Sequence, residues 1–245
     1  MPIGRPSLTT QMVVENYLRA ISQNESVFAS ALMNARKLRA RSVRHGAAYS
    51  KRLISNPDEG LHVMDSICAG HLDKAKRFER ESEMVAAMVV LAIDEDVRRL
   101  CRLTTDVKPF AFRFGEPRVG STTAELIWAA ANSCRHAFEW DIAVNRNDKK
   151  VMAGKAFHRN QSILGGLLNT NTMIVSQCCY EALTALASED VDSETCEIEI
   201  LNRRLQSVAR ELCASLPGGE DIFDEAFDKI ETERVYREAD FDLIR

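Results

Sequence analysis

Hydrophobic residues recur every three, four or seven positions along almost the whole chain, which is the spacing of one face of an α-helix. No strand-like alternation is convincing outside three phenylalanines near residue 112. The pattern predicts helices over residues 14–38 (one helix or two), 61–78, 82–103, 123–144, 162–186, 194–216 and 221–236. We therefore expect an all-α fold, a bundle of about seven helices forming a single helical domain over 1–245.

Local signals mark the ends of several predicted helices. Ser82 is the predicted N-cap of the third helix, and the spacing of Thr122 and Glu125 predicts a capping box at the start of the fourth. Residues 108–120 carry two Pro and two Gly around Phe110, Phe112 and Phe114, which predicts a loop or a short extended piece. The polar residues 145–160 predict an irregular or weakly helical connection.

Composition is that of a globular protein, with 45% hydrophobic and 28% charged residues among 245. No apolar run reaches the roughly 18 residues of a membrane span, and the first residues lack a signal-peptide pattern. We therefore expect a cytoplasmic protein without membrane contact. The seven cysteines form no CxxC and predict reduced thiols, and no metal-ligand or nucleotide-loop motif occurs, so neither metal nor cofactor is expected.

Charge is distributed unevenly along the chain. Residues 1–57, a basic N-terminal helical region, hold nine Lys and Arg against two acids, whereas residues 181–245 hold seven against eighteen. The basic residues gather in one segment without acids: Arg36, Lys37, Arg39, Arg41, Arg44, Lys51 and Arg52. This cluster predicts either contact with the phosphates of RNA or DNA, or pairing with the acidic end of the same chain or of a second copy.

The candidate site lies in the predicted helix 123–144, within a helical half spanning 119–245. Trp128, Asn132, His136 and Trp140 follow one another at intervals of four and so share a helix face, with Glu139 beside it. Every polar atom of such a stripe needs a partner, so it suits a cleft or a subunit interface better than a dry core. Alternatively, the same polar groups are buried and fix the helix register.

The segment Ala131-Asn132-x-x-Arg135-His136-x-x-Glu139-Trp140 resembles the Ala-Asn-x-x-Lys-His-x-x-Glu-Trp signature of a group of bacterial helical proteins, which is itself similar to the HEPN motif. HEPN domains are helical bundles, commonly dimers, and many are metal-independent RNases of toxin–antitoxin, CRISPR and phage-defence systems. The resemblance implies a homo-oligomer that engages RNA, or a cognate antitoxin or defence partner. It also implies endoribonuclease activity.

The same resemblance implies roles for individual residues. His136 would transfer the proton, Asn132 would orient His136 or the phosphate, and Glu139 would orient the imidazole. The HEPN motif has an arginine where this chain has Ala131, so the cation would come from Arg135 or from a second copy. Trp128 and Trp140 would support the site.

Three other interpretations follow from the sequence. The chain could be a non-catalytic oligomeric scaffold in which the Asn132 and His136 stripe is structural. The spacing of Arg39 and His45 also falls within a loose Arg-to-His motif, although a solvated basic face explains it better, because the segment is rich in Arg. A DNA-binding regulator has only charge in its favour, because no helix-turn-helix signature occurs.

Overall fold

The computed structural model describes residues 8–55, 66–103, 113–152, 154–170, 177–188 and 196–242. Within these residues the chain is almost entirely helical, which confirms the predicted all-α multi-helix bundle. The elements are α1 (Leu8–Ser55), α2 (Ser66–Cys101), β1 (Pro117–Arg118), β2 (Ser121–Thr122), α3 (Thr123–Asn145), α4 (Lys149–Met152), α5 (Lys155–Leu168), α6 (Cys179–Leu186), α7 (Glu197–Ala214) and α8 (Gly219–Asp242).

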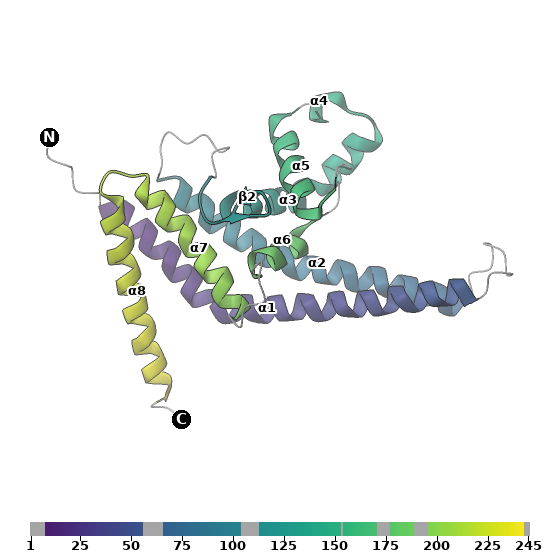
Figure 1. The fold of residues 1–245 in the computed structure, drawn as a ribbon, viewed down its shortest axis with the longest axis horizontal. Helices are drawn as coiled ribbons and strands as arrows, with labels where there is room; N and C mark the ends of the chain where they lie inside the picture. Colours follow the sequence, from purple (N-terminus) through teal and green to yellow (C-terminus); the bar gives the residue numbers. More distant parts are fainter. Residues whose placement is uncertain are drawn as a thin grey trace.

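Helices α1 and α2 form a long antiparallel hairpin that runs through the whole molecule (Figure 1). Their apolar stripes pack against each other, so Val14 and Leu18 of α1 and Val90 and Ile93 of α2 are all buried. The other helices cover only one end of this hairpin, and its far end projects beyond them (Figure 1). There the two helices are also joined by the Ser42 hydroxyl, which donates to the carbonyl oxygen of Ala75 at 2.8 Å.

Two predicted helices, 61–78 and 82–103, are a single helix in the structure. Ser82 is therefore not an N-cap, because it lies fully buried in the middle of α2. Its hydroxyl donates to the carbonyl oxygen of Ala35 in α1 at 2.8 Å. The polar side chain that suggested a helix start thus satisfies a contact between two helices. The turn signal at 56–60 lies outside the described residues.

The capping box predicted before α3 is confirmed. The Thr122 hydroxyl accepts from the backbone N–H of Glu125, whose carboxylate in turn accepts from the N–H of Thr122. Just before it, β1 and β2 pair antiparallel across a two-residue turn, Val119-Gly120, as the predicted short extended piece. Phe110 and Phe112 lie outside the described residues, and Phe114 packs against the core.

The predicted helix 162–186 is two helices, and the predicted connection 145–160 is partly helical. Helix α5 begins at Lys155 and ends where Asn169 adopts a left-handed conformation, with φ of 48°. The N–H of Thr170 donates to the carbonyl oxygen of Gly165 at 3.0 Å and closes the helix end. Gly165 and Gly166 thus lie in the last turn of α5, next to the break.

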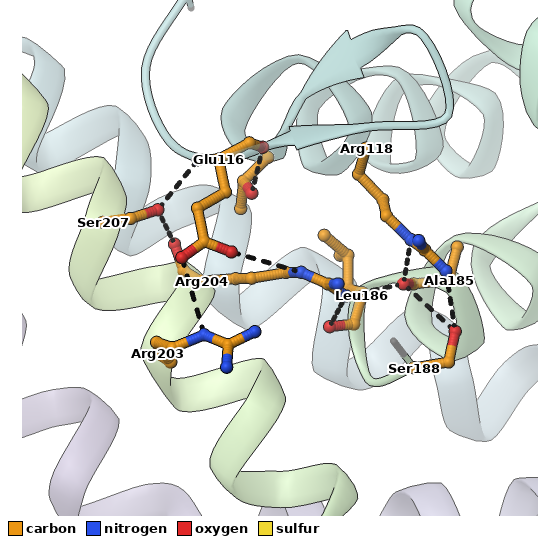
Figure 2. Close-up of polar contacts among 9 residues, drawn as sticks. Glu116, Arg118, Ala185, Leu186, Ser188, Arg203, Arg204 and Ser207 are labelled. Carbon is orange, nitrogen blue, oxygen red and sulfur yellow. Dashed lines mark hydrogen bonds and ion pairs between the residues drawn. The ribbon is translucent and has the colours of Figure 1, made fainter. Parts of the chain in front are cut away.

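Helix α6 is short, eight residues, and is held at both ends by charged side chains. At its N-terminus the Glu83 carboxylate accepts hydrogen bonds from the N–H groups of Cys179, at 2.5 Å, and Tyr180, at 3.0 Å. At its C-terminus the buried guanidinium groups of Arg118 and Arg204 donate to the last carbonyl oxygens (Figure 2). An anion at the N-terminus and cations at the C-terminus both complement the helix dipole.

Helices α7 and α8 close the broad end of the bundle against α1. The Tyr17 hydroxyl donates to the carbonyl oxygen of Leu205 in α7 at 3.0 Å, and burial raises the pKa of Tyr17 well above its ordinary value. Arg19 pairs with Glu233 of α8 at 3.0 Å. In the described part of the chain, no helix combines the length and the hydrophobicity needed to cross a bilayer.

Candidate functional site

Helical spacing places His136 on the exposed half of α3. Its side chain is 44% exposed, and Nδ1 lies 2.9 Å from Oε2 of Glu139, one turn further along. The imidazole stacks on the indole of Trp140 with ring centroids 5.8 Å apart. Trp140 is itself buried and meets the ring of Phe157 in α5 edge to face at 5.5 Å.

This arrangement holds the imidazole on two sides. A hydrogen bond from Nδ1–H to the Glu139 carboxylate fixes the tautomer in which Nε2 carries the lone pair. Stacking on Trp140 fixes the plane of the ring, and Phe157 in turn holds Trp140. An oriented, solvent-accessible imidazole with a carboxylate on one nitrogen is competent for proton transfer at the other.

The remaining members of the stripe are less exposed. Asn132 is half-buried, and no residue in the described ranges hydrogen-bonds to its side-chain amide. Trp128 belongs to the hydrophobic core, and the guanidinium of Arg159 lies 5.9 Å from its ring centroid. The stripe is therefore exposed mainly at His136, with Trp128 and Trp140 buried on either side of it.

Arg135 is directed towards α2. Its Nη1 lies 2.7 Å from Oδ2 of Asp94, a carboxylate with only 1% of its side chain exposed. The same oxygen is 2.7 Å from Nε of Arg98. The charge of Arg135 is thus paired across the α2–α3 contact, and using it on a phosphate would leave a buried carboxylate with one cation fewer.

The basic segment divides into two groups, the first of which pairs within the chain. Arg36 forms an ion pair with Glu197 of α7. Arg39 contacts Glu79 of α2 at 2.8 Å and Glu181 of α6 at 2.6 Å. For these two arginines the structure matches the intramolecular alternative that the charge distribution predicts.

The second group faces solvent on a different side of α1. Lys37, Arg41, Arg44 and Lys51 are all exposed, and their spacing of four, three and seven puts them on one helix face. They span about 21 Å at 1.5 Å per residue. Within the described residues, none of Lys37, Arg41 and Arg44 has an acidic partner. The Arg41 guanidinium lies over the ring of Phe78, 5.8 Å from its centroid. Arg52 is half-buried.

Helix α2 adds further cations to the far half of the hairpin. We call residues 36–55 and 66–81 the arm, since they form the far half of the α1–α2 hairpin. The arm holds eleven Lys and Arg against three acids. The sequence alone does not show that the α2 cations lie near the basic segment of α1, because hydrophobic spacing predicts a helix but not its partner. They are Lys74, Lys76, Arg77 and Arg80.

Two histidines meet inside the arm. Nδ1 of His45 lies 3.0 Å from Nδ1 of His71, and the His45 ring stacks on Phe78 at 5.6 Å. Partial burial lowers the pKa of His45, and the neighbouring His71, Lys74 and Arg44 lower it further. Since His45 faces His71 and Arg39 binds glutamates, the second Arg-to-His spacing does not bring its two side chains together on one site.

The residues that the structure describes contain no group of three or more His, Cys, Asp or Glu placed to hold a metal ion. Comparisons with known proteins identify no relative: no protein-family model, no curated protein and no solved structure matches the chain.

Proposed function

We propose that this protein binds RNA along the exposed face of the arm. The observation that carries the proposal is the row formed by Lys37, Arg41, Arg44 and Lys51, four solvent-exposed cations on one face of α1. Arg36 and Arg39 pair with carboxylates of the same chain, whereas Lys37, Arg41 and Arg44 form no ion pair within the described residues. The side chains of the row are exposed to solvent, where phosphates can reach them.

The geometry of the row suits a sugar–phosphate backbone. Successive cations separated by three or four residues are about 4.5–6 Å apart along the helix axis, which is close to the spacing of phosphates in a single strand. Neutralising several phosphates releases counterions, and this is the main source of sequence-independent affinity. The resemblance of the α3 motif to RNases favours RNA over DNA.

The test is the binding of a labelled single-stranded RNA, measured by fluorescence anisotropy over a range of salt concentrations. In the variant Lys37→Gln/Arg41→Gln/Arg44→Gln, we expect at least tenfold weaker binding. We also expect the log–log slope of affinity against salt to fall by about two, at roughly 0.7 for each phosphate that is no longer neutralised. A DNA of the same sequence is measured in parallel.

A matched control separates a specific surface from the effect of net charge. The variant Arg203→Gln/Arg210→Gln/Arg234→Gln removes three exposed cations that belong to α7 and α8 instead of the α1–α2 hairpin. We expect less than a twofold change in affinity for this control. Equal losses in the two triple variants, or no binding of RNA at low salt, would contradict the proposal, and tighter binding of DNA would reassign the ligand.

A second candidate function, metal-independent cleavage of RNA, is favoured by the 2.9 Å contact between His136 and Glu139. In this reaction Nε2 of His136 would take the proton from a ribose 2′-hydroxyl. The hydroxyl oxygen would then attack the adjacent phosphorus and expel the 5′-oxygen, which takes up a proton from solvent and leaves as a 5′-hydroxyl, while the other fragment ends in a 2′,3′-cyclic phosphate. Because Arg135 is paired with Asp94, the charge on the phosphate would have to be met by another cation, from this copy or a second one.

Cleavage of mixed tRNAs and single-stranded RNAs in EDTA tests this candidate. We expect loss of activity in His136→Ala and a smaller loss in Glu139→Gln, which keeps the side-chain shape but weakens the hold on the imidazole. Undiminished cleavage by His136→Ala would exclude the assignment.

The scaffold alternative makes a different prediction for the same residues. If Asn132 and His136 form a subunit interface, Asn132→Ala/His136→Ala should dissociate an oligomer, as light scattering after gel filtration would show. If the site is catalytic, the double variant keeps both its mass and its melting temperature, since His136 is half exposed. Homo-oligomerisation and an antitoxin or defence partner are proposals that rest on the motif resemblance.

A further inference from the structure

We propose that a cavity at the base of the arm binds a nucleoside monophosphate group, either as a free nucleotide or as the phosphorylated end of an RNA. The cavity has a volume of about 700 Å³ and opens between α2, the C-terminal end of α5 and the N-terminal end of α6. This volume falls within the usual range for small-ligand sites, roughly 300–1,000 Å³. The cavity does not include His136 or the exposed cations of α1.

The acidic side chains that line the cavity already have partners in the protein. Glu79 and Glu181 share the guanidinium of Arg39, which also lies over the ring of Tyr180 at 5.1 Å. Glu83 accepts from two backbone N–H groups at the start of α6. Each of these carboxylates therefore already has a partner within the protein that holds it in place.

Two cations of the lining are not compensated in this way. Lys76 and Arg80 lie four residues apart on α2, so their side chains start about 6 Å from each other on one helix face. Among the residues that the structure describes, neither forms an ion pair. Two neighbouring cations with unused charge, facing a cavity, fit the dianionic phosphate of a monoester better than a single carboxylate.

The rest of the lining specifies the body of the ligand. Met84 and Leu168 offer apolar surface on which a planar ring can lie. The fixed carboxylates of Glu79 and Glu181 can accept hydrogen bonds from hydroxyl or amino groups. A phosphate, several hydroxyl donors and a flat ring occur together in a nucleoside monophosphate.

The inference depends on the proposed RNA-binding function only for the source of that nucleotide. Lys76 and Arg80 belong to the arm, so an RNA lying along the cations of α1 could place its phosphorylated end in the cavity. A free nucleotide would bind without any RNA surface. The two sources predict different ligands, which titration can distinguish.

The test is isothermal titration of the protein with UMP, uridine and inorganic phosphate, and with one short RNA prepared with and without a 5′-phosphate. We expect UMP to bind at least tenfold more tightly than uridine, and Lys76→Ala/Arg80→Ala to abolish that preference. The control is Arg77→Ala. Arg77 lies in the same part of α2, pairs with Glu81 and does not line the cavity. This variant should leave UMP binding within twofold.

If UMP does not bind but the 5′-phosphorylated RNA binds more tightly than its unphosphorylated form, through Lys76 and Arg80, the ligand is an RNA end. If neither shows a preference for the phosphate, or if Arg77→Ala weakens binding as much as the double variant, the inference is overturned. Failure of the RNA-binding proposal is visible separately, because Lys37→Gln/Arg41→Gln/Arg44→Gln should leave UMP binding unchanged.

Discussion

Arg118 and Arg204 donate hydrogen bonds to the same acceptor, the carbonyl oxygen of Ala185, each with a donor–acceptor distance of 2.9 Å (Figure 2). Arg118 precedes α3 and Arg204 lies in α7, so the C-terminus of α6 joins two distant segments. Glu116 balances this charge, with its carboxylate 3.8 Å from Nε of Arg204.

Arg204→Met keeps most of the apolar stem but removes the donors to Ala185 and Leu186. Hydrogen bonds from charged groups contribute about 1.5–3 kcal/mol, so we expect the free energy of unfolding to fall by about 3 kcal/mol. Urea denaturation measures it. Arg203→Met, whose side chain is half exposed, serves as control and should cost less than about 0.5 kcal/mol. Similar losses in both variants would contradict the role given to Arg204.

Glu83 makes stability depend on pH. Burial raises the pKa of its carboxyl above the ordinary value, although the hydrogen bonds from Tyr180 and Cys179 oppose the shift. The folded state therefore binds the proton more tightly than the unfolded state, and the stability from protonated Glu83 is lost as pH rises through its raised pKa. Above the ordinary pKa of glutamate, we expect the free energy of unfolding of the wild type to fall relative to that of Glu83→Gln. A relative rise with pH would refute this.

Val119 adopts a conformation that disfavours a β-branched side chain. Its φ is 51°, followed by Gly120 at 76°, so both turn residues lie in the left-handed region. Asn is the preferred residue at the first position, and we expect Val119→Asn to stabilise the protein by about 0.5–1 kcal/mol. Gly120→Ala should destabilise it by about 1 kcal/mol. Thermal denaturation should show a higher melting temperature for Val119→Asn and a lower one for Gly120→Ala than for the wild type.

His45 should couple RNA binding to proton uptake. Its pKa is lowered by partial burial, then by His71, Lys74 and Arg44. Bound phosphates would offset these cations and raise the pKa of His45, so the complex would hold the proton more tightly than the free protein. We expect affinity for RNA to increase as pH falls below the ordinary histidine pKa of about 6.5. In His45→Gln the increase should be smaller, and an unchanged pH profile would exclude this role.

Sequence patterns predict those contacts that form between residues close together in the sequence. The capping box of Thr122 and Glu125 can be recognised because its two members are three residues apart. Ser82 is misread because its hydroxyl meets Ala35, and the division of the basic segment cannot be seen because Arg36 pairs with a residue 161 positions away. In the candidate site, the contact of His136 with Glu139 follows from helical spacing, whereas the pairing of Arg135 with Asp94 depends on how α3 docks against α2.

The projection of the α1–α2 hairpin beyond the bundle also affects how the protein unfolds. The far end of the arm consists of α1 and α2 alone, whereas the opposite end of the hairpin also packs against α7 and α8 (Figure 1). The arm can therefore open by local unfolding, at a lower free energy than the core, and its amide hydrogens should exchange sooner. A ligand lying along both helices would slow that exchange without altering the global stability of the core.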